Sequence, residues 1–198
     1  MRLVPWWALL SSGCAPVLLV SGWMIAALLH GPGYEPITQT ISLLGVVGAP
    51  GYRLMTGVLI ALGACHLLTA WGLRPAAVAG RVALGAGGVM AVVLAFSPAP
   101  RSGGSLWHGT VVTIGFTLLA VWPVMAAVRR GAAPWGLRPA VTITVSALMG
   151  LGGAWFLLEL QLHGAAGLAE RALTTAQSLW PFAVVASCLR HRDPDVEV

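Results

Sequence analysis

The side chains best suited to chemistry are a carboxyl group and two imidazoles, at Glu159, His108 and His163, in a sequence that is otherwise mostly apolar. Trp155, Glu159 and His163 are spaced by four residues, so one face of a helix would carry an indole, a carboxyl group and an imidazole. A carboxyl group taken out of water is more easily protonated and can then donate that proton. We therefore predict that Glu159 gives or takes a proton and that His108 or His163 assists. The structural alternative is an ion pair between Glu159 and an arginine.

Further polar and aromatic residues are predicted to hold the substrate. Arg171 could bind an anionic group, and Glu170 begins a stripe with Thr174 and Gln177 on one helical face. Tryptophan faces, with Trp23 as an additional candidate, could stabilise a cation during a proton-initiated terpenoid cyclisation. The structural alternatives are a favourable charge at a helix start for Glu170 and an ion pair for Arg171. The predicted substrate-binding residues are Tyr34, Glu35, Gln39, Glu170, Arg171, Trp107, Trp155 and Trp180.

A metal or haem site is the third kind of chemistry that the sequence raises. His30, His108 and His163 are expected at one depth, and Glu159 or Glu170 could complete a ligand shell. The three histidines lack a local ligand spacing such as HxxxH, so the sequence predicts no metal and no haem, and any other cofactor stays unknown. The three cysteines have no CxxC spacing and are expected to be small buried hydrophobic residues.

Membrane-spanning helices must position these residues. Of the 198 residues, 58 % are hydrophobic and 9 % are charged, whereas a soluble domain has roughly a quarter charged residues. This composition excludes a water-soluble globular protein. About 20 apolar residues cross a bilayer, and a helix satisfies every backbone polar group there. We predict an all-α polytopic membrane helix bundle, a single transmembrane domain over residues 1–198, with six spans at 5–30, 52–73, 76–97, 107–128, 139–162 and 168–189.

Arginines indicate how the helices are oriented. Eight arginines fall on one side of the predicted spans, and Arg53, Arg101 and Arg171 fall on the other. Positive residues are enriched in cytoplasmic segments, so we predict that both termini are cytoplasmic. The segment 31–51 would then be an outer lid. Its residues 34–45 predict a short interfacial helix with Ile37 and Ile41 on one apolar face.

Small residues predict where helices pack closely. Ala83, Gly87 and Ala91 recur at every fourth position in the third span, and glycines cluster at positions 150, 152 and 153 in the fifth. Small faces let helix backbones approach one another in a membrane. We expect both spans to use these faces against neighbouring helices.

Composition also bears on source and partners. All eleven basic residues are arginine, and lysine and asparagine do not occur, which is typical of a GC-rich bacterial genome. Without lysine there is no Schiff-base chemistry, which excludes a retinal protein. The arginines lie near helix ends, so the positive charge indicates orientation and not nucleic-acid binding. We expect a multi-pass protein of the bacterial inner membrane whose partners are membrane lipids, and we make no prediction of its oligomeric state.

Several short motifs occur in a fixed order along the chain: Tyr34-Glu35-Pro36, Thr40-Ile41-Ser42, His108-Gly109 and Gly167-Leu168-x-Glu170-Arg171. In these motifs the chain resembles a family of small six-helix bacterial membrane proteins that is catalogued as a domain of unknown function. The resemblance implies a compact helical unit with its signature residues on the extracytoplasmic side. It implies no activity.

The sequence leaves three functions open. The first is a membrane-embedded enzyme that acts on a lipid or isoprenoid by acid–base chemistry in an extracytoplasmic cavity bordered by Glu159 and His108. The second is a module that binds or transports a lipid or small solute, and the third is an accessory protein without catalysis. Few polar residues lie in the predicted cytoplasmic half, which weighs against a complete transport path.

Overall fold

Six long helices make up most of the computed structural model, which describes residues 4–101, 103–129 and 133–191. Within these residues each of the six is long and apolar enough to cross a membrane, as in a multi-pass membrane protein, and no strand occurs. The predicted spans are confirmed to within a few residues. The helices are α1 (Trp6–His30), α2 (Tyr52–Gly72), α3 (Val78–Ala95), α4 (Leu106–Met125), α5 (Pro139–Leu162) and α6 (Ala166–Arg190), with two short 3₁₀ helices, η1 (Ile41–Gly45) and η2 (Trp135–Leu137).

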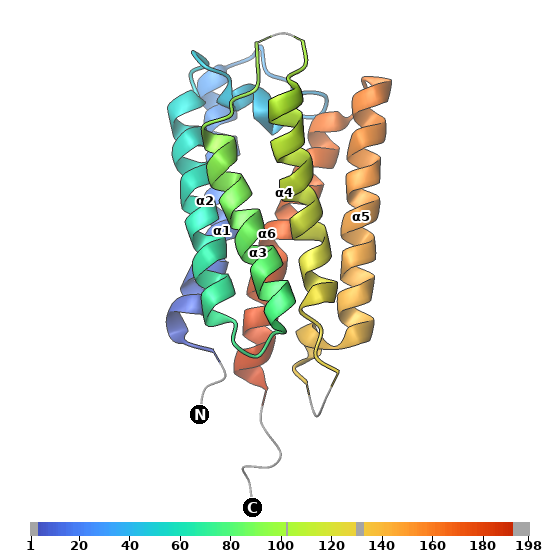
Figure 1. The fold of residues 1–198 in the computed structure, drawn as a ribbon. Coiled ribbons are helices and arrows are strands. Elements are labelled where there is room, and N and C mark those ends of the chain that lie inside the picture. Colours follow the sequence, from blue (N-terminus) through green and yellow to red (C-terminus); the bar gives the residue numbers. More distant parts are fainter. Residues whose placement is uncertain (1–3, 102, 130–132, 192–198) are drawn as a thin grey trace, which may run out of the picture.

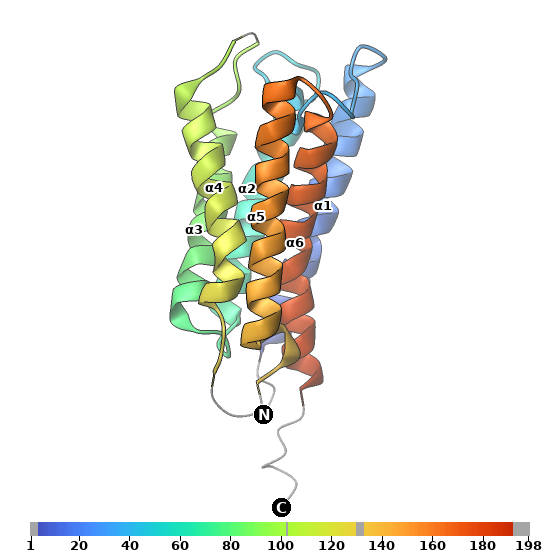
Figure 2. The same ribbon diagram turned by 90° about the vertical axis from the view of Figure 1, so that its right-hand side faces the viewer.

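The six helices form a ring in chain order. Each helix packs against its neighbours in the sequence, and α6 returns to pack against α1. The start of α1 and the end of α6 lie at one end of the bundle, which we call the terminal end, and the segment 31–51 lies at the opposite end, which we call the lid end (Figures 1 and 2). A ring of this kind encloses a central space that side chains must fill or leave open.

Glycines set the close contacts of α3. A side chain at Gly63 of α2 would lie 2.5 Å from the Gly88 carbonyl oxygen, and one at Gly80 would meet the backbone of Ala126. Ala83 and Gly87 are also buried, whereas Ala91 is half-buried, so the predicted small face is confirmed for two of its three residues.

The glycines of α5 behave differently. At Gly150 and Gly153, the position that a side-chain carbon would take has no neighbouring atom within 4 Å, and only Gly152 of this cluster faces a neighbour, Leu173. The prediction of a close-packed glycine face was therefore wrong for most of this cluster. The reason is that α5 packs against only α4 and α6 among the long helices, besides the short η2, and turns most of its surface outward.

The centre of the ring is filled with side chains at the terminal end. The largest buried hydrophobic cluster joins the first turn of α1 to the ends of α2, α4 and α6, and includes Leu73, Leu84, Trp122, Leu137 and Val184. All five are fully buried. Solid packing at this end leaves the lid end as the place for a cavity.

The lid segment is less helical than its pattern predicts. Residues 35–39 form one turn, Thr40 is extended at φ −70° and ψ 158°, and only η1 beyond it is helical. Ile41 is buried as expected, whereas Ile37 is 55 % exposed. The physical reason is that long-range contacts from α6 engage backbone groups of this segment, so they are not available for a continuous helix.

Candidate functional site

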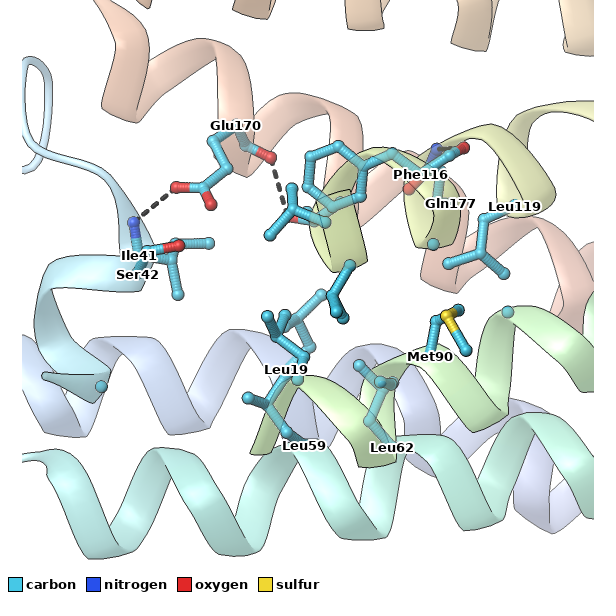
Figure 3. Close-up of a pocket in the computed structure, with 18 of the residues that line it drawn as sticks. Leu19, Ile41, Ser42, Leu59, Leu62, Met90, Phe116, Leu119, Glu170 and Gln177 are labelled. Atoms are coloured by element: carbon cyan, nitrogen blue, oxygen red, sulfur yellow. Dashed lines mark hydrogen bonds between the residues drawn. The ribbon is translucent and has the colours of Figure 1, made fainter. Parts of the chain in front are cut away.

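A cavity of about 110 Å³ lies inside the ring at the lid end. Its lining comes from α1, α2, α3, α4, α6, η1 and the residues that follow α3, while α5 packs outside it. On α2 the lining runs from Met55 to His66 and on α4 from His108 to Leu119, a length of about 16 Å at the helical rise. Figure 3 shows leucine, methionine and phenylalanine side chains along this length. The apolar lining suits a hydrocarbon chain, but about 110 Å³ is well below the roughly 300–1,000 Å³ of typical ligand pockets, so a long chain would bind only if lining side chains move apart.

His108 stands at the lid end of the cavity on the first turn of α4. Its Nδ1 lies 2.7 Å from the Ser97 carbonyl oxygen, and its Nε2 lies 3.2 Å from the Ser42 hydroxyl oxygen. A carbonyl oxygen only accepts hydrogen bonds, so Nδ1 carries the proton of the neutral ring and Nε2 has a free lone pair. The Ser42 hydroxyl therefore donates to Nε2. The Ser105 hydroxyl caps this helix by accepting from the His108 amide.

Glu170 faces the same end from the first turn and a half of α6. Its side chain is 4 % exposed, and Oε2 accepts the Ile41 amide of η1 at 2.5 Å. Figure 3 shows this carboxyl group directed toward Ile41 and Ser42. The Ile41 amide is the one hydrogen-bond donor that the described residues provide to the carboxyl group. Glu170 thus joins α6 to η1 and borders the cavity as an ionisable group.

The deep end of the cavity also contains polar atoms. Gln177 donates from Nε2 to the Phe116 carbonyl oxygen at 3.0 Å, but its Oε1 is buried without a partner among the described residues. His66 is also buried, and its Nδ1 likewise has no partner within the described chain. Both residues line the cavity, as does Thr174. All three members of the α6 stripe predicted from spacing therefore face one cavity.

Arg171 holds the lid segment to α6. Its Nη1 donates to the carbonyl oxygens of Pro36 at 2.7 Å and Gln39 at 3.1 Å, and its Nη2 donates to the Tyr34 hydroxyl. The guanidinium carbon lies 5.0 Å from the Trp23 ring centroid, within reach of a cation–π interaction. These contacts occupy both terminal nitrogens of the guanidinium group, while Nε is buried without a partner among the described residues. The structure therefore places Arg171 in the fold of the lid and not in the cavity.

Tyr34 supports the same contact from the lid side. Its hydroxyl oxygen lies 3.1 Å from the Gln39 carbonyl oxygen and 3.0 Å from that of Thr40. Burial raises the pKa of Tyr34 above its ordinary value of 10.0, although the hydrogen bond from Arg171 opposes this. The phenol thus stays protonated and donates to the lid backbone. Tyr34 lies outside the cavity lining, and the prediction that it binds substrate stays a prediction.

Glu159 and His163 lie outside the cavity, contrary to the prediction that Glu159 and His108 share one. The Glu159 carboxylate accepts from Trp155 Nε1 at 3.1 Å and from the Ala165 amide at 2.6 Å, and so closes the turn between α5 and α6. His163 ends α5 in the left-handed conformation at φ 53° and is exposed. The spacing of four on α5 is real, but this face of α5 is directed away from the cavity.

The remaining predicted binding residues also lie outside the cavity lining. Trp107 donates from Nε1 to the Ser97 hydroxyl oxygen at 2.8 Å. Trp155 and Trp180 line a separate open groove between α5 and α6. The exposed Glu35 and the half-buried Gln39 hydrogen-bond to nearby backbone amides of the lid. Phe116 is the aromatic hydrocarbon ring in the cavity lining, and the tryptophans expected to stabilise a carbocation do not line it.

The described residues contain no group of three His, Cys, Asp or Glu side chains that could hold a metal ion. His30 instead packs against the Tyr34 ring, with ring centroids 5.6 Å apart. Arg2, Arg130 and Arg192, which contributed to the orientation argument, lie outside the described residues. Ser42 is the site residue to which sequence reasoning gave no chemical role. It lay within a quoted motif, but its partner His108 is 66 residues away and no local pattern joins them.

The motif segments of the lid, α4 and α6 meet at this end of the bundle. A model of the family described as "Protein of unknown function (DUF998)" matches residues 14–187. The chain belongs to this family. The resemblance inferred from the motifs is confirmed, and the match extends from α1 into α6. Comparison with curated proteins and with solved structures found no match.

Proposed function

We propose that this protein is a membrane-embedded enzyme that acts on a lipid or isoprenoid by acid–base chemistry, with His108 and Glu170 as the groups that move protons. The observation that carries this proposal is the distribution of polarity in the cavity. At the lid end of the cavity lie an imidazole whose Nε2 carries no proton and a buried carboxyl group. An apolar chain would fill the cavity, and its polar end would reach these two groups.

We further propose that the lid end faces the extracytoplasmic side of a bacterial inner membrane. Among the described arginines, five lie toward the terminal end: Arg74, Arg81, Arg129, Arg138 and Arg190. Arg53, Arg101 and Arg171 lie toward the lid end. The excess of positive charge at the terminal end favours a cytoplasmic location for both termini. Substrate would then come from the outer leaflet.

Packing supports an enzyme or a binding protein over a transporter. A transport path must connect both ends of the bundle. The cluster around Leu84, Trp122 and Leu137 fills the ring at the terminal end with fully buried side chains. The cavity is therefore closed toward the terminal end, as expected for a site where substrate enters and leaves on one side.

Photolabelling tests whether an apolar chain occupies the cavity. The protein would be reconstituted in lipid nanodiscs with a 16-carbon fatty alcohol that carries a diazirine in its chain, irradiated, and mapped by mass spectrometry. We expect labels on cavity residues such as Leu62 and Met90. Ala91→Phe should fill the cavity and reduce these labels by at least about tenfold, because a phenyl ring occupies the space of several methylene groups. The matched control is Ala79→Phe, at an exposed alanine of the same helix.

Lipid analysis tests whether the bound molecule reacts. Nanodiscs that contain a bacterial polar lipid extract would be incubated with the wild-type protein, with His108→Gln, with Glu170→Gln, or with Glu159→Gln as the control. We expect one lipid class to change mass with wild type and with the control, and to stay unchanged with the two site variants. Cavity labelling without any lipid conversion would refute the enzyme and leave a lipid-binding protein. Labels that Ala91→Phe does not reduce would refute the cavity site itself.

A further inference from the structure

We propose that Ser42 is the nucleophile of this site and His108 its general base, so that the substrate is an ester of a long acyl chain. This inference rests on the proposed function, because it specifies the reaction of the same cavity. Nucleophilic catalysis by serine needs a base within hydrogen-bond reach and a third group that orients the base. The Ser42 hydroxyl, the His108 ring and the Ser97 carbonyl oxygen form this sequence of contacts.

The hydrogen bond of Ser42 differs from those of the helical serines. The hydroxyls of Ser12, Ser178 and Ser187 donate to backbone carbonyl oxygens three residues earlier in their own helices. Such bonds are the ordinary way to satisfy a hydroxyl in an apolar helix. Ser42 instead contacts an imidazole nitrogen that has no proton in the neutral ring. Its hydroxyl proton can therefore pass directly to a base.

Hydrogen bonds fix both partners of the Ser42–His108 contact. The preceding residue, Ile41, donates its amide to Glu170, which ties η1 to α6. Ser97, which accepts from His108 and lies just after α3, donates its amide to the Leu94 carbonyl oxygen at 3.0 Å, and its hydroxyl oxygen accepts from the Trp107 indole. Glu170, one of the two proton-moving groups of the proposed function, also positions Ser42 through the Ile41 amide. The pair is thus held by three helices that surround the cavity.

The position of the pair selects the substrate. Ser42 and His108 line the lid end of a cavity that extends for about 16 Å and is lined mostly by apolar side chains, with the polar groups of Glu170, Thr174 and Gln177 along α6 and His66 at the deep end. A single acyl chain would lie along α2 and α4, and its carbonyl carbon would be the atom nearest to the Ser42 hydroxyl. The alcohol part of the ester would then extend toward the lid, where headgroups of the membrane are found. The geometry favours an acyl ester over an isoprenoid hydrocarbon, which offers no carbonyl carbon.

The reaction balances with water as the co-reactant. The Ser42 oxygen attacks the ester carbonyl carbon while its proton moves to Nε2 of His108. The bond from the carbonyl carbon to the alcohol oxygen breaks, and Nε2 returns the proton to that oxygen, which leaves as the free alcohol. Water then attacks the acyl-serine ester as Nε2 takes its proton. The Ser42 oxygen leaves with that proton, and a free fatty acid is the second product.

A long-chain alkyl fluorophosphonate tests this inference directly, because it forms a covalent bond with an activated serine and releases fluoride. The wild-type protein in nanodiscs would be treated with a probe bearing a 12-carbon chain, and the adduct would be located by peptide mass spectrometry. We expect the phosphonyl group on Ser42. His108→Gln should slow labelling by at least about 100-fold, as general base catalysis contributes on this scale. Ser12→Ala, at a buried serine outside the cavity lining, should label like wild type.

The outcomes separate the two proposals. A wild-type adduct on Ser42 that depends on His108 supports both. Cavity photolabelling without a fluorophosphonate adduct on Ser42 overturns the nucleophile and leaves the acid–base enzyme. An adduct on another serine with Ser42 unmodified would also overturn Ser42 as the nucleophile. Because the adduct is mapped on the wild-type protein, the result does not depend on whether Ser42→Ala folds.

Discussion

Replacing Arg171 with methionine should detach the lid segment from α6. In the wild type the guanidinium group donates to the carbonyl oxygens of Pro36 and Gln39 in the lid. Methionine fills a similar volume but donates no hydrogen bond, so these acceptors lose a charged donor in a half-buried place. The substitution removes the contact without introducing a new charge. It therefore measures how strongly α6 holds the lid.

The two carbonyl contacts set a lower bound on the cost, because Arg171 also donates to the Tyr34 hydroxyl. A hydrogen bond from a charged group contributes about 1.5–3 kcal/mol, so the two carbonyl oxygens together account for about 3–6 kcal/mol. Removing the desolvated charge of Arg171 recovers part of this amount, and we take the lower end, about 3 kcal/mol. For a chain of this size each kcal/mol shifts Tm by roughly 2–4 °C. Arg171→Met should therefore lower Tm by about 6–12 °C.

A thiol-reactive dye gives the assay in a Cys14→Ala, Cys65→Ala background, because Cys14 is exposed and Cys65 half-buried, whereas Cys188 is buried in the terminal core and becomes reactive on unfolding. Hydrogen exchange on residues 34–40 would report the lid directly and should become faster in the variant. The control is Arg101→Met, which removes one hydrogen bond at 3.2 Å, to the Val47 carbonyl oxygen, from an exposed side chain. We expect that control to shift Tm by less than about 4 °C. An Arg171→Met shift no larger than the control, with unchanged exchange of the lid, would refute the assigned role.

Three further predictions concern the packing of α3, the contact between the lid and α6, and the turn between α5 and α6. Gly80→Val should lower the free energy of unfolding by about 2–3 kcal/mol in the same dye assay, because the valine side chain would meet the Ala126 backbone. The control Gly150→Val should not change it. Equal effects of the two substitutions would contradict the close packing at Gly80. Tyr34→Phe should cost about 1–3 kcal/mol, measured by thermal unfolding, because Arg171 loses an acceptor and the lid a donor. Glu159→Gln should cost about 1 kcal/mol by weakening the α5–α6 turn, yet leave cavity photolabelling unchanged; loss of labelling would restore Glu159 to the site.

The six helices were predictable because long apolar segments have one structural solution in a bilayer. The sequence did not predict how each helix is rotated about its own axis. In a soluble protein the polar face marks the outside, but lipid is as apolar as the protein interior, so both faces of a membrane helix are apolar. Glu159 and Glu170 therefore gave the same signal in the sequence. In the folded bundle Glu170 lines the cavity, whereas Glu159 accepts a hydrogen bond that closes the turn between α5 and α6.

The stripe on α6 was a partial exception. Glu170, Thr174 and Gln177 were placed on one face by their spacing, and all three line the cavity. Several polar residues on one face carry information that a single carboxyl group does not, because their desolvation is costly unless they share a polar or open surface. The Ser42–His108 contact had no such local pattern. It joins η1 to α4 and depends on how both are packed.

A structure of the protein in lipid nanodiscs, solved with the 12-carbon fluorophosphonate bound, would test the central claim most directly. The account predicts a continuous density from the Ser42 hydroxyl oxygen along the apolar lining toward His66, with Nε2 of His108 beside the phosphonyl group. A probe bound on the outer surface of the helices, with the cavity filled by neighbouring side chains, would contradict it.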